Sequence, residues 1–433
     1  MGLKYFVIVS LVLGVELSFV NARGGVGLPS ARPEAVGFSA ERLSRFDALM
    51  RRMIHDKEFA GIVTMVARHG KVLQSKAYGL RDIGSGAPMQ TDSIFRIYSM
   101  TKPVTGVAMM ILYEEGKWSP ADPIAKYIPE FANLKVLGGF DSQRKMLLED
   151  PVHPPTMREL MSFTAGFAGG WGTSPEDKLF QDESGHNAIL GASSLEMMID
   201  RLAKLPLVYQ PGTRWLYGLS TDIQGYLVQQ LSGKPFAQFL QERIFEPLGM
   251  TDTAFYVPRN KWDRFATLYE RTDKGDLVIA PGFPTYHFDR EPGLPSGGAG
   301  LVSTAGDFLK FEQMLLNGGE LAGVRILGPT TLSLMRANHL SETLTLTETL
   351  GDQLAGMGWG YDVGVITDPT LTGCLCGKDT YFWRGGAYTW FWVDPINDLV
   401  FVGMAQRQGD LFRPDVLQLS QQTLYQALID ANK

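Results

Sequence analysis

Cysteine is nearly absent from this chain of 433 residues, which contains only Cys374 and Cys376. A disulfide across one intervening residue closes a very tight ring, so we expect free thiols rather than a stapling bridge. The six histidines are scattered and no H-E-x-x-H pattern occurs, so the sequence predicts no metal site and no organic cofactor. The net charge of −6 lacks the basic excess that nucleic acid or an anionic membrane surface attracts.

Long apolar runs are also scarce, and the one near the N-terminus is short. It spans residues 6–15, follows Lys4 and precedes the small residue Ala22, which is typical of a secretory signal peptide. A membrane anchor is the alternative, but Glu16 and Ser18 interrupt a run already shorter than the ~20 residues that a span requires. We therefore expect residues 1–22 to be a signal peptide, with export to a periplasm or the outside and no stable membrane insertion afterwards.

The most informative motif is Ser99-x-x-Lys102, which opens an apolar stretch of helical composition that ends at Gly116. Residues three apart share one face of a helix, so the Ser99 Oγ and the Lys102 Nζ can meet. A serine hydroxyl is a poor nucleophile until a base removes its proton, and a buried lysine can be that base. Taken alone, the motif also fits a serine N-cap beside an exposed lysine. A second match, at residues 142–145, lies in a charged stretch and is interpreted as a solvated loop.

Strand and helix signals divide the chain into two interleaved lobes. Hairpins are predicted at residues 61–79 and 389–404, and the loop-rich stretch between them carries short helices. Because hairpins form antiparallel sheets, we expect an α/β (α+β) fold with an antiparallel sheet flanked by helices and a mostly helical inserted lobe. Residues 23–433 would form one catalytic domain. Its sheet lobe would comprise about 30–98 and 293–433, and its helical lobe about 99–292, which places Ser99 at the lobe junction.

Two further segments offer candidates for the rest of a serine–lysine site. Tyr217 lies directly before an expected helix, where a tyrosine beside a lysine could carry protons, although a core position explains it as well. Trp383-Arg384-Gly385-Gly386 directly precede a predicted strand. Glycine there lets a strand edge approach a ligand, and a backbone N–H could point at an oxyanion, although a bulge or turn would also use glycine.

Together, these motifs resemble a known family. Ser99-x-x-Lys102, Tyr217-Gly218-Leu219 and Trp383-Arg384-Gly385 have the order and approximate spacing of the three motifs of serine β-lactamases and penicillin-binding proteins. The chain looks most similar to the class C branch and to its esterase relatives, the family VIII carboxylesterases, over roughly residues 35–428. Other stretches that resemble this family are residues 122–131, 163–167, 247–253 and 296–301.

The resemblance implies a role for each matched residue. Ser99 would be the acylated nucleophile, Lys102 its general base, and Tyr217 the group that assists this base and protonates the leaving group. The backbone N–H groups of Ser99 and Gly386 would form the oxyanion hole. Which of Lys102 and Tyr217 takes the first proton stays open, because a coupled pair need not have a single-residue answer.

Two positions depart from the lactamase pattern and bear on the substrate. Leu219 stands where these lactamases carry an Asn that contacts the amide of the antibiotic, and Trp383 stands where a Lys meets the β-lactam carboxylate. Losing such a charge-assisted contact costs about 1.5–3 kcal/mol, which disfavours anionic β-lactams and spares neutral esters. Arg384 could restore a positive charge nearby. Trp383, Arg384, Gly385 and Leu219 are therefore the expected substrate-binding residues.

We expect an exported serine carboxylesterase that cleaves short-chain, small-molecule esters through an acyl-enzyme on Ser99 and could retain weak β-lactamase activity. The alternatives are a class C-like β-lactamase, a hydrolase of D-amino-acid or linear amide bonds, and a penicillin-binding protein without turnover. An α/β-hydrolase is rejected, because its G-x-S-x-G elbow is lacking and the nearest segment, residues 293–298, has the wrong spacing.

Overall fold

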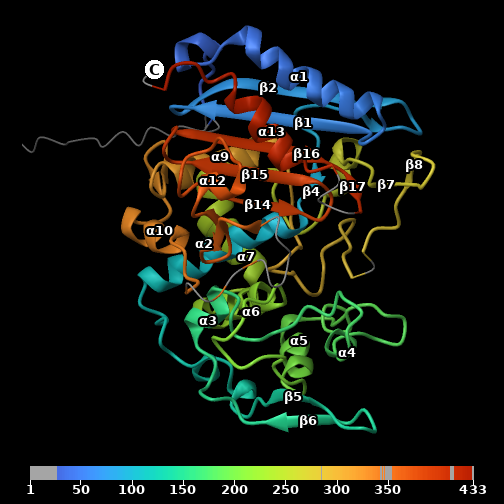
Figure 1. Ribbon diagram of the computed structural model, residues 1–433, viewed down its shortest axis with the longest axis vertical. Coiled ribbons are helices and arrows are strands. Elements are labelled where there is room, and N and C mark those ends of the chain that lie inside the picture. The colour runs from blue at the N-terminus through green and yellow to red at the C-terminus, as the bar shows by residue number, and fades with distance from the viewer. Residues whose placement is uncertain are drawn as a thin grey trace, which may run out of the picture.

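Eight strands form one antiparallel sheet in the computed structural model (Figure 1). The described residues are 27–283, 285–341, 344, 346, 354–409 and 414–431, so the signal peptide expected at residues 1–22 lies outside them. Across the sheet the strands are β12 (Met357–Trp359), β13 (Gly364–Ile366), β14 (Tyr381–Gly385), β15 (Thr389–Asp394), β16 (Leu399–Ala405), β1 (Gly61–Arg68), β2 (Lys71–Asp82) and β3 (Ala87–Pro88). All neighbouring pairs are antiparallel, which confirms the expected sheet.

Helices pack on both faces of this sheet. They are α1 (Ala40–His55), α9 (Ala305–Leu316) and α13 (Val416–Tyr425). The C-terminal part of the chain also forms the helices α10 (Pro329–Arg336) and α12 (Pro369–Thr372). Phe46 of α1 packs edge-on against Phe401, which stacks on Trp392, whereas Phe308 of α9 contacts Phe391. Successive residues of a strand point to opposite faces, so Trp392 and Phe391 place α1 and α9 on opposite sides of the sheet.

The second lobe is mostly helical and lies below the sheet in Figure 1. Its helices are α2 (Thr101–Glu114), α3 (Met157–Met161), α4 (Pro175–Lys178), α5 (Leu195–Leu202), α6 (Ser220–Ser232), α7 (Phe236–Leu240) and α8 (Glu246–Leu248). Residues 101–112 of α2 are all buried, as expected of a helix that is apolar on every side. Helix α2 packs against both α6 and α10, so the segment that carries Lys102 lies at the centre of the molecule.

Short strands complete the structure. They are β4 (Phe95–Arg96), β5 (Val136–Phe140), β6 (Met146–Glu149), β7 (Tyr269–Arg271), β8 (Leu277–Ile279), β9 (Val302–Ser303), β10 (Glu320–Leu321), β11 (Val324–Arg325) and β17 (Arg407–Gln408). The second S-x-x-K match, residues 142–145, is the exposed turn between β5 and β6, which confirms its interpretation as a solvated loop. No α-helix in the described part of the chain combines the length and hydropathy that a bilayer-spanning segment needs.

One local prediction was wrong. Cys374 and Cys376 form a disulfide, because the chain brings their Cα atoms to 5.2 Å, within the range that the bond requires, while the intervening Leu375 is exposed. Helix α7 ends at Leu240, and residues 241–245 continue as a π-helical turn. Pro247 explains this change, because it has no N–H to continue the α-helical hydrogen bonds.

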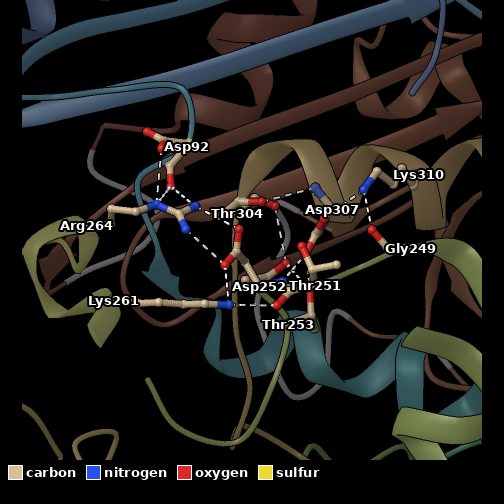
Figure 2. A network of polar contacts seen from close by, with 11 residues as sticks. Asp92, Gly249, Thr251, Asp252, Thr253, Lys261, Arg264, Thr304, Asp307 and Lys310 are labelled. Atoms are coloured by element: carbon tan, nitrogen blue, oxygen red, sulfur yellow. Dashed lines mark hydrogen bonds and ion pairs between the residues drawn. The ribbon is translucent and has the colours of Figure 1, made fainter. Parts of the chain in front are cut away.

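A polar network ties the loop after α8 to α9 (Figure 2). Arg264 donates two hydrogen bonds to Asp252, at 3.0 and 2.7 Å, and Lys261 lies 2.8 Å from the same carboxylate. The Asp252 backbone N–H in turn donates to Asp307 of α9 at 2.7 Å, and Lys310 pairs with Asp307 at 3.0 Å. This network explains the polar residues in the 247–253 stretch, which fix the connection between the two lobes.

Candidate active site

Ser99 lies in a single 3-10 turn, Tyr98–Met100, directly before α2. Tyr98 has a φ of 39°, in the left-handed region that residues other than glycine rarely adopt. Its ring centroid lies 5.2 Å from that of Phe283 and 5.6 Å from that of Phe288. Burial among these rings raises the pKa of the Tyr98 hydroxyl to about 12. Such strain persists only where the surroundings hold it, so the aromatic contacts of Tyr98 help to fix the backbone at Ser99.

The serine and lysine side chains meet as the spacing of the motif predicts. The Lys102 Nζ donates to the Ser99 Oγ at 3.3 Å and to the Gly298 carbonyl at 2.8 Å. Lys102 is 2% exposed, so its amine is held in a site from which water is largely excluded. The Tyr217 hydroxyl donates to the same Ser99 Oγ at 2.7 Å, from the loop that leads into α6. The serine oxygen therefore contacts two groups that can carry its proton.

Trp383 is almost buried and packs against Tyr217, with ring centroids 5.6 Å apart. Its Nε1 donates to the Tyr217 hydroxyl at 3.3 Å, and its ring packs edge-on against Trp359 with centroids 4.5 Å apart. The neighbouring Arg384 also lines the cavity, but it pairs with Asp415 at 3.0 Å. A carboxylate of the protein therefore engages the positive charge that Arg384 could have offered a substrate.

Two expected substrate-binding residues, Leu219 and Gly385, are not among the residues that line the cavity. Leu219 is fully buried beneath the start of α6, because the chain turns its side chain into the core. Gly385 is needed for packing. A Cβ at that position would lie 2.2 Å from the carbonyl oxygen of Ile97, two residues before Ser99. The end of β14 thus abuts the turn that holds the nucleophile.

Sequence reasoning missed the buried carboxylate of Asp222 on α6. Its Oδ1 accepts hydrogen bonds from the Ser296 hydroxyl at 2.5 Å and from the Gly298 N–H at 3.1 Å. Burial raises the pKa of Asp222, and the hydrogen bond from Ser296 and the charge of Lys102 reduce this rise. Asp222 therefore holds the loop whose Gly298 carbonyl accepts from Lys102. The signal in the sequence was an aspartate in the first turn of an apolar helix, together with the S-G-G-A-G stretch at residues 296–300.

A cavity of about 430 Å³ opens in front of Ser99. Gly386 lines it, and a Cβ there would lie 3.8 Å from the Cβ of Tyr98, which places Gly386 beside the nucleophile's turn. Within the described residues no cluster of three His, Cys, Asp or Glu side chains could hold a metal ion. The other lining residues are Tyr98, Ser99, Lys102, Trp171, Tyr217, Asp222, Phe283, Tyr286, Gly298, Ala299, Leu354, Phe382, Trp383 and Arg384.

Comparison with known proteins identifies the family of this chain. A family model described as Beta-lactamase matches residues 46–422. Esterase EstB of Burkholderia gladioli is 30% identical over 84% of this chain and 90% of EstB. Lovastatin esterase of Penicillium rubens is 30% identical over 84% of this chain and 93% of that esterase. The solved structure of EstCE1, a hydrolase with promiscuous acyltransferase activity, has a TM-score of 0.72 at 26% identity over 89% of this chain and 98% of EstCE1. The chain therefore belongs to the Beta-lactamase family, and it is a serine hydrolase with the fold of that family.

Proposed function

We propose that this protein is a serine carboxylesterase that cleaves short-chain carboxylic esters through an acyl-enzyme on Ser99. The observation that carries the proposal is the position of the Ser99 Oγ, 3.3 Å from the Lys102 Nζ and 2.7 Å from the Tyr217 hydroxyl, in a largely apolar cavity. Among the similar proteins, EstB and lovastatin esterase are esterases by name, and EstCE1 is a hydrolase.

The reaction needs two displacements at the ester carbonyl. The Ser99 Oγ attacks the carbonyl carbon while its proton passes to the Lys102–Tyr217 pair, and a tetrahedral oxyanion forms. Backbone N–H groups of Ser99 and Gly386 would stabilise this oxyanion. The carbon–oxygen bond to the alcohol then breaks, and the alkoxide leaves with the proton that the pair holds. Water, activated by the same pair, attacks the acyl-Ser99 ester and releases the carboxylic acid.

The charges around the cavity favour neutral substrates. Trp383 offers no cation where lactamases of this branch carry a lysine, and Arg384 is paired with Asp415. A β-lactam carboxylate entering this cavity would lose its hydration without the lysine that pairs with it in those lactamases. A neutral ester does not incur this cost. Ester hydrolysis is therefore proposed as the main activity, and β-lactam hydrolysis as a weak side reaction.

The test compares p-nitrophenyl butyrate with a chromogenic cephalosporin on the purified protein. We expect kcat/KM for the ester to exceed that for the cephalosporin by orders of magnitude. A higher value for the cephalosporin would identify a β-lactamase instead. A single burst of product followed by no turnover would identify a penicillin-binding protein.

Export is a separate proposal that rests on residues 1–22 alone. Their charged start, short apolar run and small-residue end are those of a signal peptide. N-terminal sequencing of the protein from the culture medium or periplasm of an expressing bacterium should place the new N-terminus near residue 23. An intact N-terminus in the cytoplasmic fraction would contradict export.

A further inference from the structure

Two large aromatic side chains remain partly exposed where they line the cavity of Ser99. Trp171 is 51% exposed and Phe283 is 39% exposed, although both lie among the cavity-lining residues. Trp171 belongs to the loop between α3 and α4, and Phe283 follows β8. Large apolar surface left open beside a catalytic serine marks a surface that a ligand can cover.

The loop around Trp171 is built to hold this side chain in place. Gln181 donates from its Nε2 to the carbonyls of Gly170 and Gly172, at 2.9 and 2.8 Å, on either side of Trp171. Asn187 donates to the carbonyl of Gly169 at 2.5 Å. A Cβ at Gly169 would lie 2.1 Å from the indole ring, so glycine lets the ring fold back over the backbone. These three hydrogen bonds fix the backbone on either side of Trp171, so its exposed ring is preorganised for contact with a ligand.

Trp171 lies on the side from which the alcohol of an ester would leave. Its ring centroid is 5.8 Å from that of Tyr217, whose hydroxyl bonds the Ser99 Oγ. The proposed reaction returns its proton to the leaving oxygen from the Lys102–Tyr217 pair, so the alcohol departs next to Tyr217. The group attached to that oxygen is then within reach of the indole ring.

Phe283 provides a second aromatic surface of the same cavity. Its ring packs edge-on against Tyr98, with centroids 5.2 Å apart, and a Cβ at Gly386 would lie 3.6 Å from its Cε2. Phe283 thus lies beside the proposed oxyanion hole, whereas Trp171 lies beside the proton carrier.

We propose that Trp171 and Phe283 bind an aromatic or other flat apolar alcohol portion of the ester, so that the substrates are neutral esters of such alcohols. This inference rests on the proposed esterase function and adds the class of leaving group. Ring-to-ring contact with an indole favours flat apolar groups. The nearby Arg384 is paired with Asp415, so an anionic group on the alcohol would gain little from it.

The test uses two butyrate esters of primary alcohols, ethyl butyrate and 2-naphthylmethyl butyrate. Both form the same butyryl-enzyme, so they differ only in the alcohol that leaves. The wild type should show a lower KM for the naphthylmethyl ester. Trp171→Ala should raise the KM for the naphthylmethyl ester about tenfold more than the KM for ethyl butyrate, while Trp171→Phe keeps most of the preference. Trp262→Ala is the matched control, because Trp262 is 42% exposed but does not line this cavity.

A binding measurement separates this inference from the esterase proposal. Calorimetry with 2-naphthylmethanol should give a Kd about tenfold weaker for Trp171→Ala than for the wild type, whether or not the protein turns over esters. Equal loss of activity on both esters, or equal Kd values for the alcohol, would overturn the inference and leave the esterase intact. Failure of the wild type to hydrolyse either ester would overturn the esterase proposal itself, and the inference with it.

Discussion

The hydroxyl of Tyr217 donates a hydrogen bond of 2.7 Å to the Ser99 Oγ. These residues are 118 positions apart, and the bond joins the loop before α6 to the turn before α2. Lys102 reaches the same oxygen from the first turn of α2. The nucleophile thus contacts two groups that can carry its proton, one from α2 and one from the loop before α6.

Tyr217→Phe removes the hydroxyl but keeps the ring that packs against Trp171 and Trp383. Because a positioned proton carrier contributes about 10²–10⁴-fold to a rate, kcat for p-nitrophenyl butyrate should fall by roughly that factor. The melting temperature should change little. Steady-state kinetics and calorimetry check both, and a kcat within threefold of the wild type would remove Tyr217 from proton transfer.

Asp222 is a positioning residue, because it acts on Lys102 through the Gly298 loop. Asp222→Ala leaves the Ser296 hydroxyl and the Gly298 N–H without their acceptor, at a cost of about 1–3 kcal/mol for each buried donor. Asp222→Asn keeps an acceptor oxygen and should be milder. We expect the unfolding free energy and kcat to be highest in the wild type, lower in Asp222→Asn and lowest in Asp222→Ala. If both variants retain wild-type kcat, Asp222 does not position Lys102.

Asp362 should make stability depend on pH. Burial raises its pKa to about 8. Thr221 and Gln224 donate hydrogen bonds to its Oδ1, which favour the ionised form and keep the rise from being larger. An unfolded aspartate has a pKa of about 4, so between about pH 4 and pH 8 the native state keeps a proton that the unfolded chain releases. This contribution therefore lowers the unfolding free energy as pH rises through that window.

The Asp362→Asn variant cannot ionise, and its amide oxygen can still accept from Thr221. Relative to the wild type, its unfolding free energy should improve steadily between about pH 5 and pH 8 in urea denaturation. A difference between the two proteins that is the same at every pH would show that Asp362 ionises as easily in the native state as in the unfolded chain.

Adjacent glycines offer a matched pair of substitutions. Gly385→Ala would bring a Cβ to 2.2 Å from the Ile97 carbonyl, whereas the nearest atom to a Cβ at Gly386 lies 3.6 Å away. Gly385→Ala should therefore displace the turn that carries Ser99 and lower both kcat and the melting temperature. Gly386→Ala should fold with nearly the wild-type melting temperature. Equal melting temperatures for the two variants would contradict this account of β14.

Local patterns in the sequence predicted much of this arrangement. The three-residue spacing of Ser99 and Lys102 requires only a helical turn, and the hairpin strands follow from alternating apolar residues and turn signals. Contacts between distant segments were not visible in this way. Asp222 meets Gly298 across 76 residues, and only the fold shows that Leu219 turns into the core while Trp171 stays exposed. Side-chain direction within irregular loops depends on tertiary packing, which no local pattern encodes.

The most direct test of the central claim is mass spectrometry of the protein quenched during turnover of p-nitrophenyl butyrate. We predict one butyryl group, located by peptide mapping on Ser99, and no adduct and no ester hydrolysis in Ser99→Ala. A butyryl group on another residue, or a Ser99→Ala variant with full activity, would contradict the assignment of Ser99 as the nucleophile.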